Sequence, residues 1–212
     1  MASTQPGIRG AQRTRDAILE AAEACFAERG FEGTRLEDIA RQVGIRRASI
    51  VYYFRDKAEL YDAVLADVID DLLERVTPVL TGPGSLVERS VAAVSTWIDY
   101  VASRPTAARL MLREVADGDA DHPPALVRHT RPFYDLIERL PASQPSDPIA
   151  HTVDPVQLAT MVAGSTVFFF AAMPTLLPGT PFDPYQPDRL EAHRTEMIAI
   201  TRRALCAAGE TA

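Results

Sequence analysis

The side chains of this chain best suited to chemistry are the cations and hydroxyls gathered between residues 34 and 60, in the stretch TRLEDIARQVGIRRASIVYYFRDKAEL. Arginine offers planar bidentate donors that fit guanine edges, whereas hydroxyls and lysine suit phosphate oxygens. The chemistry indicated is recognition of double-stranded DNA, and the alternative is a solvated basic loop beside a core hairpin. The candidate DNA-binding residues are Thr34, Arg46, Arg47, Ser49, Tyr52, Tyr53 and Lys57.

Two short helices must position these side chains. Thr34 followed by Glu37 is a capping box that predicts a helix start, and Gly44 predicts its end, because glycine takes the left-handed conformation at little cost. A second helix is predicted over about 46–54, with Ile50 facing the first helix. Two helices around a glycine turn form a helix-turn-helix, whose second helix can enter a DNA major groove.

Longer helices are predicted on both sides of this hairpin. One covers about 14–29 and follows an arm, residues 1–8, that is expected to be disordered. The other begins at the capping box of Asp56 and Glu59 and runs to about residue 76, where Pro78 is expected to end it. The N-terminus of this helix is a further candidate for holding a phosphate.

Residues 12–62 resemble the DNA-binding region of TetR-family transcriptional regulators. The departures from the family pattern are Arg46, where a helix-capping Ser or Thr is frequent, Ala48 in place of Gly, and Val51 in place of Tyr. The resemblance implies a homodimer that represses transcription until a small molecule releases it from its operator. The matching phrases, in order, are Gly30-Phe31-Glu32-Gly33-Thr34, Asp38-Ile39-Ala40, Val43-Gly44-Ile45, Tyr53-Phe54 and Lys57-Ala58-Glu59-Leu60.

The charge of the chain is unevenly distributed. The net charge of the 212 residues is −7, which alone would disfavour binding to DNA. Residues 1–57, however, hold ten Lys and Arg against eight Asp and Glu, a net of +2, and the remainder carries −9. This segregation favours a DNA-reading N-terminal domain on an acidic body, with affinity that depends on local arginines and on pairing two such domains.

The predicted fold is all-α, because no segment shows the alternation of a strand. We expect an N-terminal three-helix helix-turn-helix domain over 1–60, followed by a helical effector-binding and dimerisation domain over 61–212. Capping signals at Ser85 and Glu88 and at Asp154 mark two of the later helix starts. The later helices are predicted over about 85–104, 105–116, 123–140, 155–173 and 188–208.

The segment 155–173 contains no charged residue and is apolar on all sides, so it is expected to be buried on all sides. Together with 188–208 it is the candidate for a self-complementary four-helix interface, which a palindromic operator requires of a homodimer. A membrane span, and hence a membrane-tethered sensor, is the alternative. The absence of basic flanking residues and the polar positions Gln157, Thr160, Ser165 and Thr166 count against it.

Aromatic and apolar residues at helical positions in the second domain suit a pocket for a hydrophobic or aromatic small molecule. The alternative is that they are plain core, which would leave a DNA-binding dimer without an effector. Candidates for polar contacts, or for facing solvent, are Arg104, Arg109, Arg113, His122 and His129. The pocket candidates are Trp97, Tyr100, Met111, Phe133, Tyr134, Met161 and Phe168.

No motif for catalysis occurs: the sequence has no Gly-rich phosphate loop, nucleophile motif or HExxH. We therefore expect no enzyme activity, no cofactor and no metal site, and residues 117–121 are expected to form an acidic turn rather than a calcium loop. Cys25 and Cys206 are expected in the core, with a redox switch as the alternative. The N-terminus lacks the apolar run of a secretory signal, so a cytoplasmic location is expected.

Overall fold

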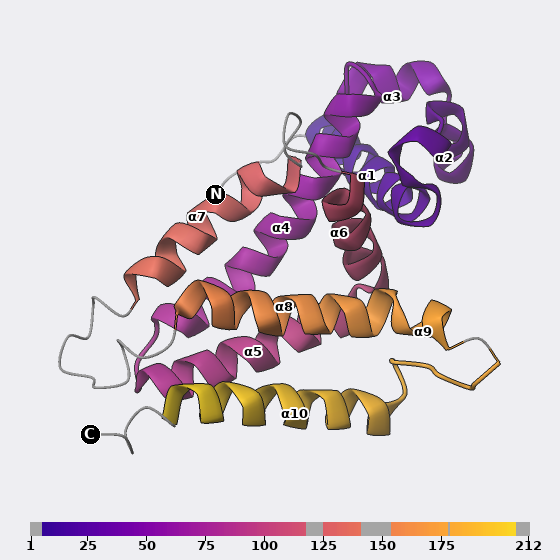
Figure 1. Cartoon of the computed structure of the whole chain (residues 1–212). Helices are drawn as coiled ribbons and strands as arrows, with labels where there is room; N and C mark the ends of the chain where they lie inside the picture. The colour runs from indigo at the N-terminus through magenta and orange to yellow at the C-terminus, as the bar shows by residue number, and fades with distance from the viewer. Residues whose placement is uncertain (1–5, 118–124, 141–153, 178, 207–212) are drawn as a thin grey trace. The chain divides into compact units, whose positions relative to one another are not determined.

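The structure is a computed structural model that describes residues 6–117, 125–140, 154–177 and 179–206. Every regular element in these ranges is a helix, which confirms the all-α prediction (Figure 1). The chain divides into two compact units, Met1–Val68 and Ile69–Ala212, and the division falls inside one continuous helix, α4 (Lys57–Thr81).

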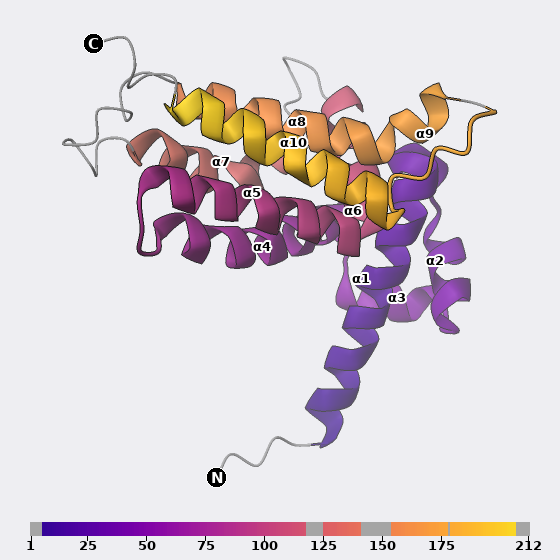
Figure 2. The same cartoon turned by 90° about the horizontal axis from the view of Figure 1, so that it is seen from below.

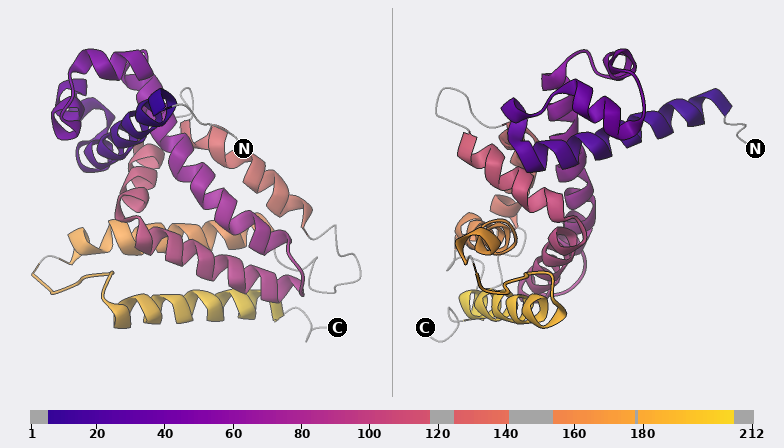
Figure 3. Two further views of the ribbon diagram at one scale, coloured as in Figure 1. Left: turned by 180° about the vertical axis from the view of Figure 1, so that it is seen from behind. Right: turned by 90° about the vertical axis from the view of Figure 1, so that its right-hand side faces the viewer.

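The N-terminal unit contains α1 (Pro6–Gly33), α2 (Leu36–Val43), α3 (Arg47–Tyr53) and the first turns of α4 (Figure 3). The helix α1 begins before the predicted residue 14, so the expected disordered arm is wrong for residues 6–8. A proline suits such a start, because its missing N–H has no intrahelical partner there. Gly30 breaks the regular helix as predicted, with φ 74° and ψ 176°.

An aromatic cluster holds these helices together. The Phe26 and Tyr61 rings meet edge to face with centroids 4.8 Å apart, and Phe31 lies 5.1 Å from Tyr61. Ile39 of α2 and Ile50 of α3 are fully buried in the same unit. The two short helices are therefore fixed by burial of apolar side chains, since helices of this length are marginal alone.

The predicted capping box at Thr34 is wrong. Arg35 is the residue that precedes α2, and it makes no side-chain capping bond. The Thr34 hydroxyl instead donates to the carbonyl oxygens of Gly30, at 2.8 Å, and Cys25, at 3.1 Å. These bonds tie the residue that enters α2 back to the C-terminal part of α1.

The C-terminal unit packs its helices around α8, with α5 and α10 beside it and α6 and α7 also in contact (Figure 2). The short α9 was not predicted: it lies in a proline-rich segment, and Pro174 falls in its first turn, where no N–H is needed. The helices are α5 (Leu86–Ser103), α6 (Pro105–Asp117), α7 (Ala125–Arg139), α8 (Pro155–Ala171), α9 (Met173–Leu176) and α10 (Pro187–Cys206).

Two predicted helix starts in this unit are confirmed. Ser85 and Glu88 form a complete capping box, in which the Glu88 carboxylate accepts from the Ser85 N–H at 2.9 Å. These bonds from Ser85, its backbone N–H first, hold the pKa of Glu88 below its usual value. The Asp154 carboxylate caps α8 by accepting from the Val156 and Gln157 N–H groups.

The prediction that Pro78 ends α4 is wrong, because the helix continues to Thr81. A proline inside a helix costs about 3 kcal/mol, whereas full burial of a leucine contributes about 1.5–3 kcal/mol. Leu80, in the turn after Pro78, is only 6% exposed, and the Thr81 hydroxyl donates to the Thr77 carbonyl at 2.8 Å. Burial of Leu80 and this hydrogen bond together offset much of the free energy that the proline costs the helix.

The prediction that α8 is buried on all sides is also wrong for a single chain. Only Val162, Thr166 and Phe170 are buried. None of the helices in the described ranges is long and apolar enough to cross a membrane. The exposed positions of α8 are Gln157, Thr160, Met161, Gly164 and Phe168.

The two cysteines differ in environment. Cys25 is buried as predicted, and burial raises the pKa of its thiol. Cys206 is exposed near the end of α10, so its predicted core position is wrong. The expected acidic turn beyond residue 117, the candidate His122 and most of the predicted loop 141–155 lie outside the described residues.

Candidate functional site

The turn between α2 and α3 fixes the exposed face of the hairpin. Gly44 adopts the predicted left-handed conformation, with φ 76° and ψ 29°, and its N–H bonds back to the last turn of α2. From there α3 turns Ile50 inward, and Phe54 directly after it is also buried, at 0% and 2% exposed. The opposite face of α3 is consequently left free for a partner.

Three of the predicted DNA-binding residues lie on that face. Arg46 and Arg47 are exposed at the start of α3, and Tyr52 is 82% exposed. Ser49 and Tyr53 are half-buried, and the Tyr53 ring stands edge-on to Tyr52 with centroids 5.2 Å apart.

Sequence reasoning missed one exposed apolar residue of α3. Val51 is 43% exposed, although apolar residues of so short a helix usually face the core. The available signal was its place directly after the inward Ile50, which on a helix turns it away from the core. An outward valine is suited to apolar contact with a thymine methyl group.

The arginines on and beside this face differ in whether a carboxylate already pairs with them, and therefore in how available they are to bind DNA. Arg47 Nε lies 3.0 Å from a Glu37 carboxylate oxygen, but both side chains are more than half exposed and such surface pairs contribute little. Arg55 is held by Asp56 and Glu59. In the described part of the chain, Arg46 has no ion-pair partner, so its charge is fully available.

Two other predicted DNA-binding residues make their contacts inside the N-terminal unit. Thr34 is 1% exposed with its hydroxyl bonded to α1, so its predicted contact with DNA is not supported by this structure. Lys57 is half-buried: its ammonium donates to the carbonyls of Phe31, at 2.8 Å, and Thr34, at 3.3 Å, and lies 4.2 Å from the centre of the Phe31 ring.

The N-terminus of α4, the predicted phosphate site, already holds an anion. The Asp56 carboxylate accepts from the Glu59 N–H at 2.8 Å. This bond, ahead of the smaller effect of Arg55, lowers the pKa of Asp56. A carboxylate kept ionised at the helix start occupies the position that a phosphate would need.

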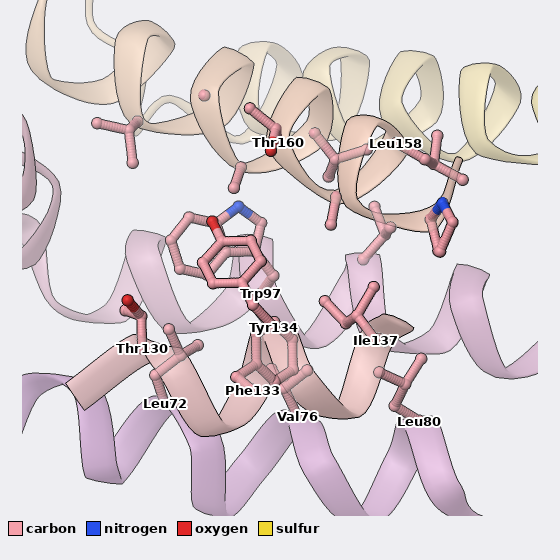
Figure 4. Close-up of a pocket in the computed structure, with 18 of the residues that line it drawn as sticks. Leu72, Val76, Leu80, Trp97, Thr130, Phe133, Tyr134, Ile137, Leu158 and Thr160 are labelled. Carbon is pink, nitrogen blue, oxygen red and sulfur yellow. The ribbon is translucent and has the colours of Figure 1, made fainter. Parts of the chain in front are cut away.

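The C-terminal unit contains a cavity of about 460 Å³ beneath α8, between α4, α5 and α7 (Figure 4). No charged side chain is among the described residues that line it, and most of the lining is aliphatic or aromatic. A volume of this size is in the range of small-molecule sites. Five of the predicted residues line it: Trp97, Met111, Phe133, Tyr134 and Phe168.

The other two predicted residues, Tyr100 and Met161, do not line the cavity. Tyr100 is buried against α4: Arg75 lies over its ring, and its hydroxyl accepts from Arg104 at 3.3 Å. Met161 is 45% exposed on the outer side of α8. Arg104 also binds Asp71, and it is no part of the lining, nor are Arg109, Arg113 and His129.

Sequence reasoning missed the contribution of α4 to the cavity. Leu72, Val76 and Leu80 project from this helix at four-residue intervals and line one wall (Figure 4). Their spacing was visible as an apolar stripe, but spacing alone does not distinguish a wall of a cavity from plain core.

The polar groups of the lining are few. Thr130 and Thr201 donate their hydroxyl protons to carbonyls one turn earlier in their own helices, at 3.0 and 2.8 Å. Trp97 Nε1 is buried and, among the described residues, has no hydrogen-bond partner. The cavity therefore suits a largely apolar occupant with very few polar atoms.

Residues 18–64 match the family model described as bacterial regulatory proteins, tetR family. A transcriptional regulator of the TetR/AcrR family from Thermobifida fusca YX-ER1 is similar at 23% identity and a TM-score of 0.60, with 91% of this chain and 96% of that one covered. FadR from Bacillus subtilis, solved with stearoyl-CoA, has 15% identity and a TM-score of 0.70, over 87% and 96% of the chains. AibR, solved with isovaleryl coenzyme A and operator DNA, has 21% identity and a TM-score of 0.70, over 88% and 97%.

The matched segment, the helix-turn-helix and the all-helical C-terminal unit together define a class of protein: a DNA-binding regulator of transcription. Within that class, residues 18–64 are similar to the DNA-binding segment of the TetR family, and the whole chain shares the fold of solved TetR-family regulators.

Proposed function

We propose that the chain is a homodimeric repressor that binds a palindromic operator and is released from it by a hydrophobic or aromatic small molecule. Residues 1–60 act as the helix-turn-helix DNA-binding domain, and residues 61–212 bind the effector and dimerise. The observation that carries the proposal is α4, one continuous helix. Its first residue, Lys57, donates to the Phe31 carbonyl at the end of α1 and to the Thr34 carbonyl before α2, and its later turns line the cavity.

On the DNA side, Arg47 reads bases, while Arg46, Ser49, Tyr52 and Tyr53 contact phosphates or base edges beside it. Arg46 and Arg47 stand at the N-terminal end of α3, the end of a recognition helix that contacts base edges. One helix of this length reads few bases, so two copies must be held about 34–36 Å apart, or a multiple of that, to reach successive half-sites.

Dimerisation is proposed through α8 and α10. On α8, Gln157 and Met161 are exposed, carry no charge and do not line the cavity, whereas the exposed Thr160, Gly164 and Phe168 are part of its lining. A large apolar side chain exposed in this way favours burial against a partner.

The effector acts by having different affinities for two arrangements of the dimer. A ligand in the cavity contacts α4, and a movement of this helix would change the separation of the two DNA-binding domains. A coupling of about 1–3 kcal/mol changes operator affinity about 5–150-fold. The acyl-CoA complexes of FadR and AibR support a small-molecule effector in proteins of this fold.

Selection of bound DNA from a random duplex pool tests operator recognition. We expect the wild type to enrich an inverted repeat with half-sites one or two helical turns apart. Arg47→Ala should weaken binding to the selected site by about 1–3 kcal/mol and relax the preference at the base pairs it reads. Arg139→Ala, an exposed arginine of α7, is the control and should behave as wild type. Failure of the wild type to enrich any duplex would contradict the proposal.

Sedimentation of Met161→Glu tests the dimer interface. Met161 does not line the cavity, so the change places a carboxylate only in the proposed interface, where burying it unpaired costs several kcal/mol. We expect dimer dissociation to become at least about 100-fold easier. Val127→Glu on α7 is the matched control, since Val127 is 47% exposed against 45% for Met161. A Met161→Glu dimer as tight as wild type would place the interface elsewhere.

A further inference from the structure

The cavity contains one buried donor that is left without an acceptor. Trp97 is only 9% exposed, and its Nε1 has no hydrogen-bond partner among the described residues. A buried N–H left unpaired costs about 1–3 kcal/mol, and buried polar groups in folded proteins are almost always paired. An unpaired donor on the wall of a cavity indicates that the occupant of the cavity supplies the acceptor.

Neighbouring atoms enclose the indole nitrogen, so an acceptor reaches it only when the side chains around it shift. Trp97 from α5 and Tyr134 from α7 are both directed into the space beneath α8, and the indole nitrogen points toward α8 (Figure 4). Thr160 of α8 lines the same region (Figure 4). After such a shift, an oxygen atom placed below α8 would meet the indole N–H in a mainly apolar chamber, next to the hydroxyl-bearing side chains of Tyr134 and Thr160.

The acceptor belongs to a neutral group. No charged side chain is among the described lining residues, and an isolated charge in such surroundings costs several kcal/mol. Arg89 is the charged residue of α5 to consider, because its Nε and Nη2 atoms are buried and unpartnered among the described residues. It does not line the cavity, however, and its Nη1 donates to the Leu80 carbonyl at the turn between α4 and α5.

The lining also defines the shape of the occupant. On α5 it extends from Leu86 to Trp97, which is about 16 Å at 1.5 Å per residue. On α8 it extends from Pro155 to Phe168, about 20 Å by the same measure. Between Trp97 and the turn after α4 the wall of α4 and α5 is aliphatic apart from Ser90, with Leu80 and Leu86 at that end. A hydrocarbon chain fits this part of the cavity.

We propose that the effector is a neutral, elongated molecule whose single carbonyl oxygen accepts a hydrogen bond from Trp97 Nε1, while its hydrocarbon chain extends toward Leu80 and Leu86. This inference rests on the proposed role of the cavity as the effector site. An acyl ester or ketone and the acyl part of a coenzyme A thioester share this chemistry, and the uncharged lining assigns the site to the neutral molecule.

The test uses four probes with one chain length: methyl laurate, tridecane, laurate and lauroyl-CoA. Binding is measured by displacement of the neutral dye N-phenyl-1-naphthylamine from the full-length protein. In the wild type, the emission of Trp97, the single tryptophan of the chain, reports occupancy independently. We expect methyl laurate to bind about tenfold more tightly than tridecane, which is the worth of one net hydrogen bond, and more tightly than laurate or lauroyl-CoA.

Two variants distinguish the contribution of the Trp97 hydrogen bond to affinity from the contribution of apolar packing. Trp97→Phe should reduce the ratio of the methyl laurate and tridecane affinities to about one, since phenylalanine has no donor. Phe133→Leu, which also changes the cavity wall, should weaken both probes and keep the ratio. Far-UV circular dichroism confirms that each variant is folded.

Several results would overturn the inference. It is wrong if tridecane binds as tightly as methyl laurate in the wild type, or if the ratio survives in Trp97→Phe. Tightest binding of laurate, lost in Arg89→Gln, would show an anionic ligand instead, and tightest binding of lauroyl-CoA would assign the site to the thioester. Uptake of none of the probes would show that the ligand class is wrong. Operator binding is measured separately, so loss of the proposed repressor function is distinguished from failure of the Trp97 contact.

Discussion

Lys57 shows how a residue with the right charge for DNA can serve the fold instead. Its ammonium ties the first turn of α4 to the carbonyls of Phe31, at the end of α1, and Thr34, before α2. The same ammonium lies over the Phe31 ring, where the cation is attracted to the negative face of the ring. Together with Tyr61 of the aromatic cluster, this side chain fixes the first turns of α4 within the N-terminal unit.

Replacing Lys57 by alanine tests that role. We expect Lys57→Ala to lower the free energy of unfolding by about 1–3 kcal/mol, because two buried carbonyls lose a charged donor and the ring loses its cation. Urea denaturation followed by circular dichroism measures the change. Arg46→Ala, at an exposed position, should stay within about 0.5 kcal/mol of wild type. Unchanged stability together with weaker binding to all DNA sequences would instead support a phosphate contact for Lys57.

At the scale of elements, the pairing of α8 with α10 depends on a buried imidazole. The His193 ring of α10 stacks on Phe169 of α8, with centroids 4.2 Å apart and planes at 10°. Its Nε2 lies 3.2 Å from the Thr166 hydroxyl oxygen. Burial lowers the pKa of His193, because the charged form would lose its hydration.

This environment makes stability depend on pH. Above the ordinary histidine pKa of about 6.5 the ring is neutral in both states, and the contribution of His193 is fully present. As pH falls below that value, the unfolded chain takes up a proton that the folded chain resists, so stability is lost until the lower folded pKa is passed. We expect urea midpoints measured from pH 8 to pH 5 to fall more steeply in wild type than in His193→Gln. Parallel curves would show that His193 is free to ionise in the folded protein.

At the scale of the whole molecule, the chain combines a weakly cationic segment with a strongly acidic one. Residues 1–57 carry a net charge of +2, and residues 58–212 carry −9. Binding to DNA must then depend on a few local contacts, because the long-range field of the protein opposes approach to phosphate.

The dependence of operator affinity on salt tests this balance. Each phosphate neutralised on B-DNA contributes about 0.9 to the slope of log affinity against log salt concentration. Arg46→Ala should reduce the slope by about 1 if the unpaired guanidinium meets a phosphate. Arg139→Ala, an exposed arginine of α7, should leave it unchanged. An unaltered slope in Arg46→Ala would remove this residue from the phosphate contacts.

The features that the sequence predicted well are those decided within a few residues. Gly44 needs a left-handed conformation, and Ser85 and Asp154 cap helices through bonds to their nearest neighbours. The role of the Thr34 hydroxyl escaped prediction because its acceptors belong to another helix, α1. Tyr100 was misplaced for a similar reason, since only the packed helices decide which apolar face meets a cavity.

Other features of the cavity and of the DNA-binding surface could not be fully predicted from the sequence, because they depend on how the helices pack. Val51 and Met161 are apolar residues at the surface. The helical position of Val51 next to Ile50 gave a signal for its exposure, whereas the exposure of Met161, in a segment without charged residues, is decided by how the neighbouring helices pack. The contribution of Leu72 and Leu80 to the lining could not be separated from ordinary core, because both environments require the same residue types.

The continuity of α4 across Val68 and Ile69 has a consequence for building chimeric regulators. Each residue added to a helix turns everything that follows by about 100°. A single inserted residue at this junction would turn Leu72 and Val76, together with the rest of their unit, by about 100° relative to Lys57, whereas seven residues, close to two full turns, would nearly preserve the angular phase. Exchange of a DNA-binding domain between such proteins is therefore limited by helical register, and the safest graft keeps the number of residues in α4 unchanged.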